Sequence, residues 1–204
     1  VYYSCHNKLH QFGTGFMVNQ KYKHLVIDFQ PIHFRMCKLR IKGRFQNYSL
    51  INVHASTEMK SEDVKDTFYE QLEKAYDECP RHDIKIVLGD FNGKIGQQNE
   101  FLNVTGMHSL HKEFYDNGMR LVDFAISRNM VISSTMFPHK NIHKPTWKSP
   151  NGETLNQIDH FLIDGKHRSN VLDVRSYRGA NVDSDHFLVL AKLHCRISRY
   201  FVYK

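Results

Sequence analysis

The chain has 204 residues, with 28 Lys or Arg against 21 Asp or Glu, so its formal net charge is +7. Its length fits one domain, and 41% hydrophobic residues supply a core that disordered chains lack. No apolar run reaches the roughly 18 residues needed to cross a bilayer, and the first residues show no targeting pattern. We therefore expect a folded chain that binds no membrane. The positive excess is compatible with a nucleic-acid partner without requiring one.

The first quarter of the chain has the pattern of a β-sheet. Short segments rich in β-branched and aromatic residues alternate with polar turns, a spacing typical of antiparallel hairpins. The predicted strands are Gly15–Asn19, Leu25–Phe29, Phe34–Ile41 and Tyr48–His54.

An amphipathic helix is predicted next, from Ser61 to Cys79. Ser61 is a good N-cap residue, Glu62 and Asp63 favour the first turn, and Pro80 ends the helix. Apolar residues recur at helical spacing and predict a core-facing stripe made of Val64, Phe68, Leu72, Ala75, Tyr76 and Cys79.

The rest of the chain alternates strands and helices. The strand Ile84–Leu88 leads into the polar stretch Gly89–Gly93, and a second helix is predicted from about Gly118 to Arg128. Further strands are predicted at Met130–Ser134, Ile158–Ile163, Val171–Tyr177 and Phe187–His194. No repeat or Pro/Gly/Ser-rich linker divides the sequence, so the pattern indicates one mixed α/β domain.

The four cysteines stand singly and form no Cys-x-x-Cys pair. The sequence therefore predicts neither a zinc ribbon nor a disulfide framework, and reduced thiols favour a nuclear or cytoplasmic location. Cys5, His6 and His10 lack the second pair of ligands that a zinc site needs, so we expect no metal there.

Four polar clusters stand at the ends of predicted strands: Asn52-Val53-His54, Gly89-Asp90-Phe91-Asn92, Asn156-Gln157-Ile158-Asp159-His160 and Ser184-Asp185-His186. In a layered α/β protein, such strand ends lie along one rim, where distant side chains converge on a ligand. Carboxylate and amide oxygens suit Mg²⁺ or Mn²⁺, and histidine beside an acid transfers protons near neutral pH. This chemistry suits the cleavage of phosphodiesters.

Each cluster also has a purely structural explanation. Asp-Phe-Asn after a strand is more often a turn than a site, and Ser-Asp-His can simply begin a strand. Asp159 can tie down a loop. We expect His160 to face outward from its strand and exclude it from the site.

Three motifs occur in a fixed order and carry a resemblance to a known family. GDFN at 89–92, QIDHFLI at 157–163 and SDHFLV at 184–189 resemble the endonuclease/exonuclease/phosphatase superfamily. Asn117–Leu121, and Thr146-Trp147 with Ser149–Gly152, resemble more narrowly the apurinic-endonuclease-like domain of non-long-terminal-repeat retrotransposons. Craniofacial-development-protein-like sequences share these features.

The resemblance implies a four-layer α/β sandwich, in which two packed mixed sheets are flanked by helices. It places this domain over residues 1–195, without the family's N-terminal part, and leaves 196–204 as a tail. It implies a magnesium- or manganese-dependent endonuclease that nicks DNA by attack of water on a phosphodiester. It further implies a monomer, derived from a protein in which the endonuclease is fused to a reverse transcriptase.

The resemblance also implies roles for individual residues. Asp90 would bind the metal and orient or deprotonate the attacking water, and Asn92 would bind the phosphate or position that water. Asp185 would be a metal ligand. His186 would contact the scissile phosphate with Asp159 as its partner, and His54 would contact the phosphate as well.

One departure from the family concerns the metal. The family's first-strand Asn and its metal-binding Glu lie upstream of the segment that matches Val1, and the glutamates present (Glu58, Glu62, Glu100, Glu113) follow other strands. With fewer charged oxygens a divalent ion stays largely hydrated, so we expect the chain to bind metal weakly and to have little or no activity as this fragment. Two alternatives stay open: a catalytically dead relic with residual nucleic-acid binding, and a phosphatase of the same superfamily that acts on small phosphoesters.

A basic segment with one aromatic ring could contact a DNA backbone near this rim. The residues that we assign to this contact are Arg120, Lys144, Trp147 and Lys148. A solvated loop over a packed Trp147 is the alternative.

Overall fold

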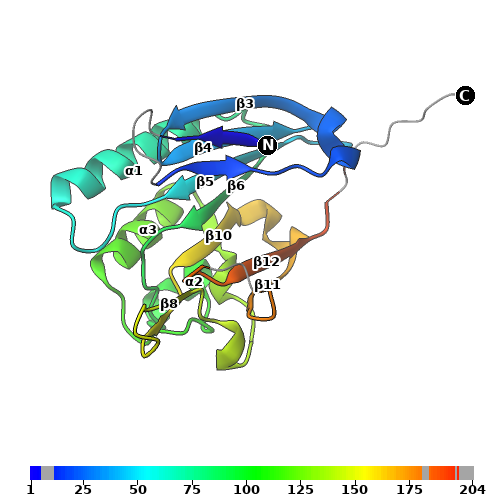
Figure 1. Ribbon diagram of the computed structural model, residues 1–204. Coiled ribbons are helices and arrows are strands. Elements are labelled where there is room, and N and C mark those ends of the chain that lie inside the picture. Colours follow the sequence, from blue (N-terminus) through cyan, green and yellow to red (C-terminus); the bar gives the residue numbers. More distant parts are fainter. Residues whose placement is uncertain (6–11, 181–183, 196, 198–204) are drawn as a thin grey trace, which may run out of the picture.

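The computed structural model describes residues 1–5, 12–180, 184–195 and 197, and a six-stranded mixed sheet lies at its centre (Figure 1). The strand order is β3-β4-β5-β6-β10-β7. The strands are β3 (Val26–His33), β4 (Met36–Ile41), β5 (Tyr48–His54), β6 (Ile84–Asp90), β7 (Met130–Ile132) and β10 (Asp159–Asp164). Only β5 and β6 pair in parallel within this sheet, and its other pairs are antiparallel.

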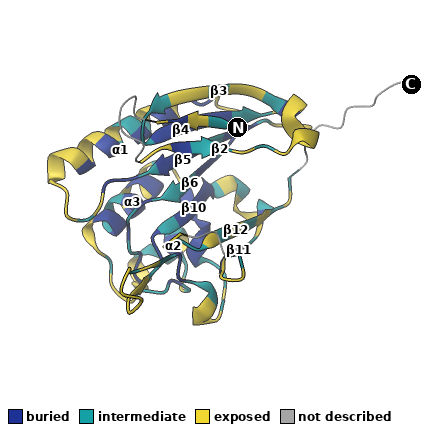
Figure 2. Cartoon of the chain, viewed as in Figure 1, coloured by how far each residue is buried: buried dark blue, intermediate teal, exposed yellow. Residues whose placement is uncertain are grey.

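Helices cover one face of this sheet. They are α1 (Glu62–Asp77), the short α2 (Leu102–Thr105) and α3 (Asp116–Ser127). Met36, Ile51 and Val53 from the strands pack with Phe68 and Leu72 from α1 in one buried cluster. Figure 2 shows the buried residues concentrated on the central strands and on the sides of the helices that face them.

Short two-stranded sheets lie on the opposite face. β1 (Tyr2–Ser4) pairs with β2 (Thr14–Phe16), and β11 (Val171–Tyr177) pairs with β12 (Leu188–Leu193). The Nδ2 atom of Asn52 on β5 donates to the Gly15 carbonyl at 2.8 Å, which ties β2 to the central sheet. Val171 and Val174 pack with Phe161 in a second cluster. The predicted α/β sandwich is therefore confirmed.

Smaller elements complete the described chain. β8 (Trp147–Lys148) pairs with β9 (Leu155–Asn156). Five short 3₁₀ helices are described: η1 (Gln20–Leu25), η2 (Asn99–Phe101), η3 (Ser133–Thr135), η4 (Asn141–His143) and η5 (Gly165–Asn170). Among the described residues, no helix has both the length and the apolar character needed to cross a membrane. The four cysteines are free thiols.

Most predicted elements form, with shifts at their ends. The first predicted strand stops at Phe16. Val64, predicted for the core stripe of α1, is 47% exposed. The helix predicted from about Gly118 begins at Asp116, and it buries Phe124 while Ile126 faces solvent. The Glu58 carboxylate caps this helix by accepting from the backbone N–H groups of Asp116 and Asn117. The sequence did not predict the first helical turn because this capping residue is distant along the chain.

Gly89 allows the parallel strands β5 and β6 to approach closely just before the polar rim. Its φ is +132°, and a Cβ atom there would lie 2.0 Å from the carbonyl oxygen of Val53. We expect Gly89→Ala to lower the free energy of unfolding by at least about 3 kcal/mol, since it combines backbone strain with overpacking. Urea denaturation measures this loss. Gly179→Ala, where a new Cβ meets its nearest neighbour at 3.4 Å, is the control. Equal stability of the two variants would contradict the explanation.

Candidate active site

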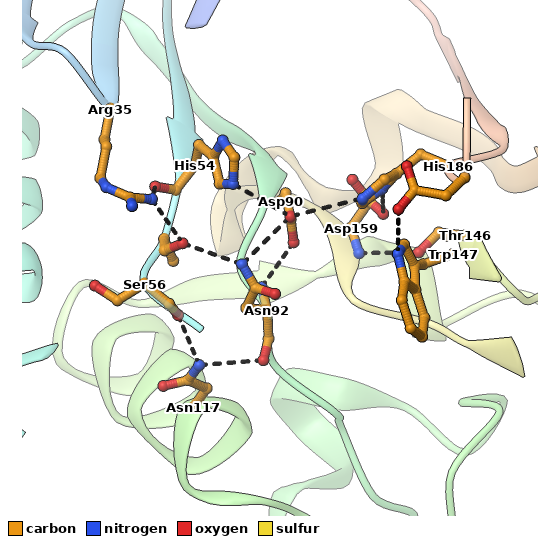
Figure 3. Close-up of polar contacts among 12 residues, drawn as sticks. Arg35, His54, Ser56, Asp90, Asn92, Asn117, Thr146, Trp147, Asp159 and His186 are labelled. Carbon is orange, nitrogen blue, oxygen red and sulfur yellow. Dashed lines mark hydrogen bonds and ion pairs between the residues drawn. The ribbon is translucent and has the colours of Figure 1, made fainter. Parts of the chain in front are cut away.

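Three strand ends bring polar side chains to one edge of the sheet. His54 ends β5, Asp90 ends the parallel strand β6, and Asp159 begins the antiparallel strand β10. In the register, Asp90 lies opposite both His54 and Asp159. The strand directions therefore place all three at the same edge of the sheet, as Figure 3 shows and as the sequence pattern predicts. We call this edge, with His54, Asp90 and Asp159, the rim.

The turn after β6 places the backbone N–H and the side-chain amide of Asn92 next to the Asp90 carboxylate. Asn92 has a φ of +48°, a conformation that asparagine tolerates better than most residues. Its backbone N–H donates to Asp90 Oδ1 at 2.8 Å. Its Nδ2 donates to Asp90 Oδ2 at 3.3 Å and to the Ala55 carbonyl at 3.1 Å. Asn92 thus fixes the orientation of the Asp90 carboxylate.

His186 reaches the same point from a distant segment of the chain. Its Nδ1 lies 3.0 Å from Asp159 Oδ2, and its Nε2 lies 4.0 Å from Asp90 Oδ2. Asp159 raises the pKa of His186 through this hydrogen bond, against the opposing effect of burial. The imidazole is therefore held with Nδ1–H toward Asp159, which leaves Nε2 facing the rim.

His54 faces Asp90 from the other side, with its Nε2 3.7 Å from Asp90 Oδ2. Burial lowers the pKa of His54, and the neighbouring Arg35 lowers it further. The sequence pattern missed Arg35, which lies in the turn between β3 and β4. Its Nη1 donates to the carbonyl oxygens of His54 and Ala55 at 3.1 and 3.2 Å.

Asp90, Asp159 and His186 form the one set of three possible metal ligands found in the described residues. One ligand atom from each lies within 4.8 Å of the other two. Burial, followed by the charge of Asp159, raises the pKa of Asp90 to about 7. A divalent cation would relieve this concentration of negative charge, and carboxylate oxygens are its preferred ligands. The two carboxylates of this set fit Mg²⁺ or Mn²⁺.

Asp185 lies beside this set rather than in it. Its Oδ2 accepts a hydrogen bond from the indole Nε1 of Trp147 at 2.8 Å. Its backbone carbonyl accepts from the N–H of Lys148, so β8 is joined to the Ser-Asp-His segment. The metal role of Asp185 stays a prediction. Asp159, which was predicted only as the partner of His186, is a further candidate ligand.

Two of the four residues predicted to contact nucleic acid, Trp147 and Lys148, lie beside the rim through their hydrogen bonds to Asp185. Lys144 follows η4, and its Nζ donates to the Ser109 carbonyl at 3.4 Å. The contact of Lys144, Trp147 and Lys148 with DNA stays a prediction.

Arg120 lies elsewhere, in a cluster of ion pairs between α1 and α3. Its guanidinium pairs with Asp116 at 3.0 Å and, in closer contacts, with Glu62 and Asp66. Three carboxylates compensate its charge, so Arg120 joins the two helices in this structure, and its contact with DNA stays a prediction.

His160 was expected to face outward, and this is wrong. Its side chain is buried beneath the rim, where Nε2 donates to the Gly93 carbonyl at 2.8 Å and Nδ1 accepts from the Ser134 hydroxyl at 2.8 Å. Strand alternation alone does not predict this, because the sheet has a packed layer on each of its two faces. Both ring nitrogens of His160 are occupied by these hydrogen bonds, which agrees with leaving it out of the site.

His160 makes the fold sensitive to acid. Burial lowers its pKa to about 4, whereas the unfolded chain has the ordinary value of about 6.5. Between these values the unfolded chain binds more protons, so stability falls as the pH falls. We expect His160 to lower the free energy of unfolding by about 2 kcal/mol as the pH falls from 7 to 5. Urea unfolding of wild type and His160→Gln at both pH values measures the difference in slope. Equal slopes would contradict this explanation.

Two further residues that support the rim were not assigned from the sequence. The Thr146 hydroxyl oxygen accepts from the backbone N–H groups of Ile158 and Asp159 at 3.0 and 3.1 Å, which fixes the start of β10. Asn117 is buried and donates to the carbonyl oxygens of Ser56 and Asn92. Their motifs were noted for the resemblance, but hydrogen bonds between distant loops leave no periodic pattern in a sequence.

Comparison with known proteins supports the fold and its family. No protein-family model matches the chain. Craniofacial development protein 2 of Tragulus javanicus is 32% identical over 197 residues, which cover 97% of this chain and 34% of the relative. The protein of the same name from Bos taurus is 30% identical over 97% of the chain and 33% of its own length. The chain is a homologue of craniofacial development protein 2. It spans about a third of the length of these relatives.

Solved structures with the endonuclease/exonuclease/phosphatase fold superimpose on this chain. The endonuclease domain of TRAS1, a telomere-specific non-LTR retrotransposon, matches with a TM-score of 0.59 and 13% identity over 86% of this chain and 70% of that one. The catalytic domain of APE2 from Xenopus laevis matches with a TM-score of 0.59 and 20% identity, over 83% and 58%. The 3′ phosphatase NExo from Neisseria, bound to a product DNA hairpin, gives 0.59 and 19%, over 82% and 71%. At these identities the likeness establishes the fold.

Proposed function

We propose that this chain is a retrotransposon-derived endonuclease domain that nicks DNA with the help of Mg²⁺ or Mn²⁺. The observation that carries the proposal is the convergence of Asp90, Asp159 and His186 within 4.8 Å at one rim. His54 and Asn92 complete this group. Carboxylates beside an ion-paired histidine suit the hydrolysis of a phosphodiester.

The residues divide the chemistry between them. Asp90, held by Asn92, orients the attacking water and accepts its proton. His186, whose pKa is raised by Asp159, presents a protonated Nε2 to a phosphate oxygen as negative charge builds up. His54 contacts the same phosphate from the β5 side. Asp159 keeps the His186 ring in the orientation that this role requires.

A divalent ion held by the Asp90 and Asp159 carboxylates would supply charge stabilisation at the phosphate. Among the described residues no glutamate joins this group. Glu58 instead caps α3, and Glu62 pairs with Arg120. We therefore expect weak binding, with an ion that keeps several waters.

The nature of the substrate is proposed from the family. The TRAS1 neighbour is a retrotransposon endonuclease domain, and the NExo structure holds a DNA product. Trp147 and Lys148 beside the rim are suited to contact a DNA strand. Fusion to a reverse transcriptase and a monomeric state stay predictions.

A substrate comparison tests this proposal. With Mg²⁺, the purified chain should cut a labelled DNA duplex and hydrolyse p-nitrophenyl phosphate little or not at all. Turnover of the small phosphoester in preference to DNA would favour the phosphatase alternative. Binding of DNA without hydrolysis of either compound would favour the catalytically dead relic.

A further inference from the structure

Asn117 holds together the two loops that carry the rim residues (Figure 3). The residue is 2% exposed. Its Nδ2 donates to the Ser56 carbonyl at 2.9 Å, in the loop that follows His54. The second hydrogen of this amide goes to the Asn92 carbonyl at 3.1 Å, in the loop that follows Asp90. One buried amide thus bridges the ends of β5 and β6.

The bond to Asn92 acts on the conformation of that residue. Asn92 has a φ of +48°, which turns its N–H and its side-chain amide toward Asp90. A residue in this region is retained when its surroundings hold it there. The Asn117 amide holds the Asn92 carbonyl and so maintains this turn.

The helix that carries Asn117 is itself fixed against the same loops. Glu58 accepts from the Asn117 backbone N–H at 3.3 Å, and the Tyr69 hydroxyl donates to the Asn117 carbonyl at 3.4 Å. At Gly118 a Cβ atom would lie 2.0 Å from the Lys94 carbonyl oxygen. Asn117 and Gly118 therefore pack the start of α3 closely against the loops beneath the rim.

We propose that Asn117 is a positioning residue, which sets the direction of the Asp90 carboxylate through the Asn92 turn. The inference rests on the proposed nuclease function for its consequence in catalysis. Its structural part, the control of the Asn92 turn, stands independently of that function.

The effect on catalysis separates positioning from a general loss of stability. Asn117→Ala removes both hydrogen bonds, and we expect kcat for nicking to fall about 10- to 100-fold with KM changed less than about twofold. Asn117→Ser can satisfy one of the two carbonyls and should give an intermediate kcat. The control is Tyr76→Phe, which loses a buried hydrogen bond to Asp164 of 2.6 Å outside the rim. It should lower Tm by a few degrees, as should Asn117→Ala, and leave kcat unchanged.

Hydrogen exchange followed by NMR gives a measurement that needs no activity. In Asn117→Ala, exchange of the Asn92 N–H, which donates to Asp90, should be at least about 10-fold faster than in wild type. Exchange of the Lys85 N–H, which donates to Asp164, should not change in that variant. If Asn117→Ala fails to fold, the same comparison is made with Asn117→Ser.

The outcomes distinguish this inference from the proposed function. A lower kcat together with faster exchange at Asn92 supports the inference. If wild type does not nick DNA but Asn92 exchange still accelerates, the nuclease proposal fails and the positioning of Asn92 is supported. Unchanged exchange at Asn92, or equal loss of kcat in Tyr76→Phe, overturns the inference.

Discussion

Replacement of Asp90 by asparagine is expected to reduce nicking of DNA by at least about 10³-fold. Asp90 is a candidate metal ligand, and we propose that it also orients the attacking water, so the substitution should remove two contributions at once. The amide cannot accept a proton from water and is a weaker ligand for a hard cation. The rate of open-circle formation from supercoiled plasmid measures the loss.

The control for Asp90→Asn is Asp28→Asn. Asp28 lies exposed on β3 and accepts a hydrogen bond from Gln30. The control should nick at the wild-type rate. If a folded Asp90→Asn variant retains more than about a tenth of the wild-type rate, Asp90 does not have the role assigned to it.

Replacement of Asp159 by asparagine is expected to reduce nicking by about 10²- to 10³-fold. The carboxylate orients His186 through the 3.0 Å contact at Nδ1 and raises its pKa. Without that charge His186 loses its proton at lower pH, so the alkaline limb of the pH–rate profile should move toward acid. The measurement is the nicking rate from pH 5 to pH 9.

A second Asp–His pair in the chain provides a matched control for Asp159→Asn. Asp173 Oδ1 lies 2.6 Å from His139 Nε2, between β11 and the loop before η4. Asp173→Asn should leave both the rate and the pH profile as in wild type. An unchanged alkaline limb in Asp159→Asn would contradict the assigned role of His186.

Local patterns predicted most of the strands and helices because burial repeats with the period of each element. The stripe Phe68, Leu72 and Ala75 on α1 is buried as its spacing predicts. The ends of elements were harder to place, since α3 begins where the distant Glu58 carboxylate caps it. Pairing of non-adjacent strands, such as β6 with β10, depends on long-range packing that periodicity does not contain.

The candidate site was predicted to the extent that strand ends imply a common rim. His54, Asp90, Asp159 and His186 do meet there. Arg35 and Asn117 were missed because they act through backbone carbonyls of other loops. His160 was misplaced because one histidine in a strand gives no indication of which layer will cover it.

We propose that this chain carries a metal-dependent active site for DNA cleavage, formed by Asp90, Asp159 and His186. The most direct test of this proposal is incubation of the purified 204-residue chain with supercoiled plasmid and Mg²⁺ or Mn²⁺, with and without EDTA. We predict open circles that form with the metal, disappear with EDTA and are absent for Asp90→Asn. A folded chain that gives no open circles with either ion, or equal nicking in EDTA, would contradict the account.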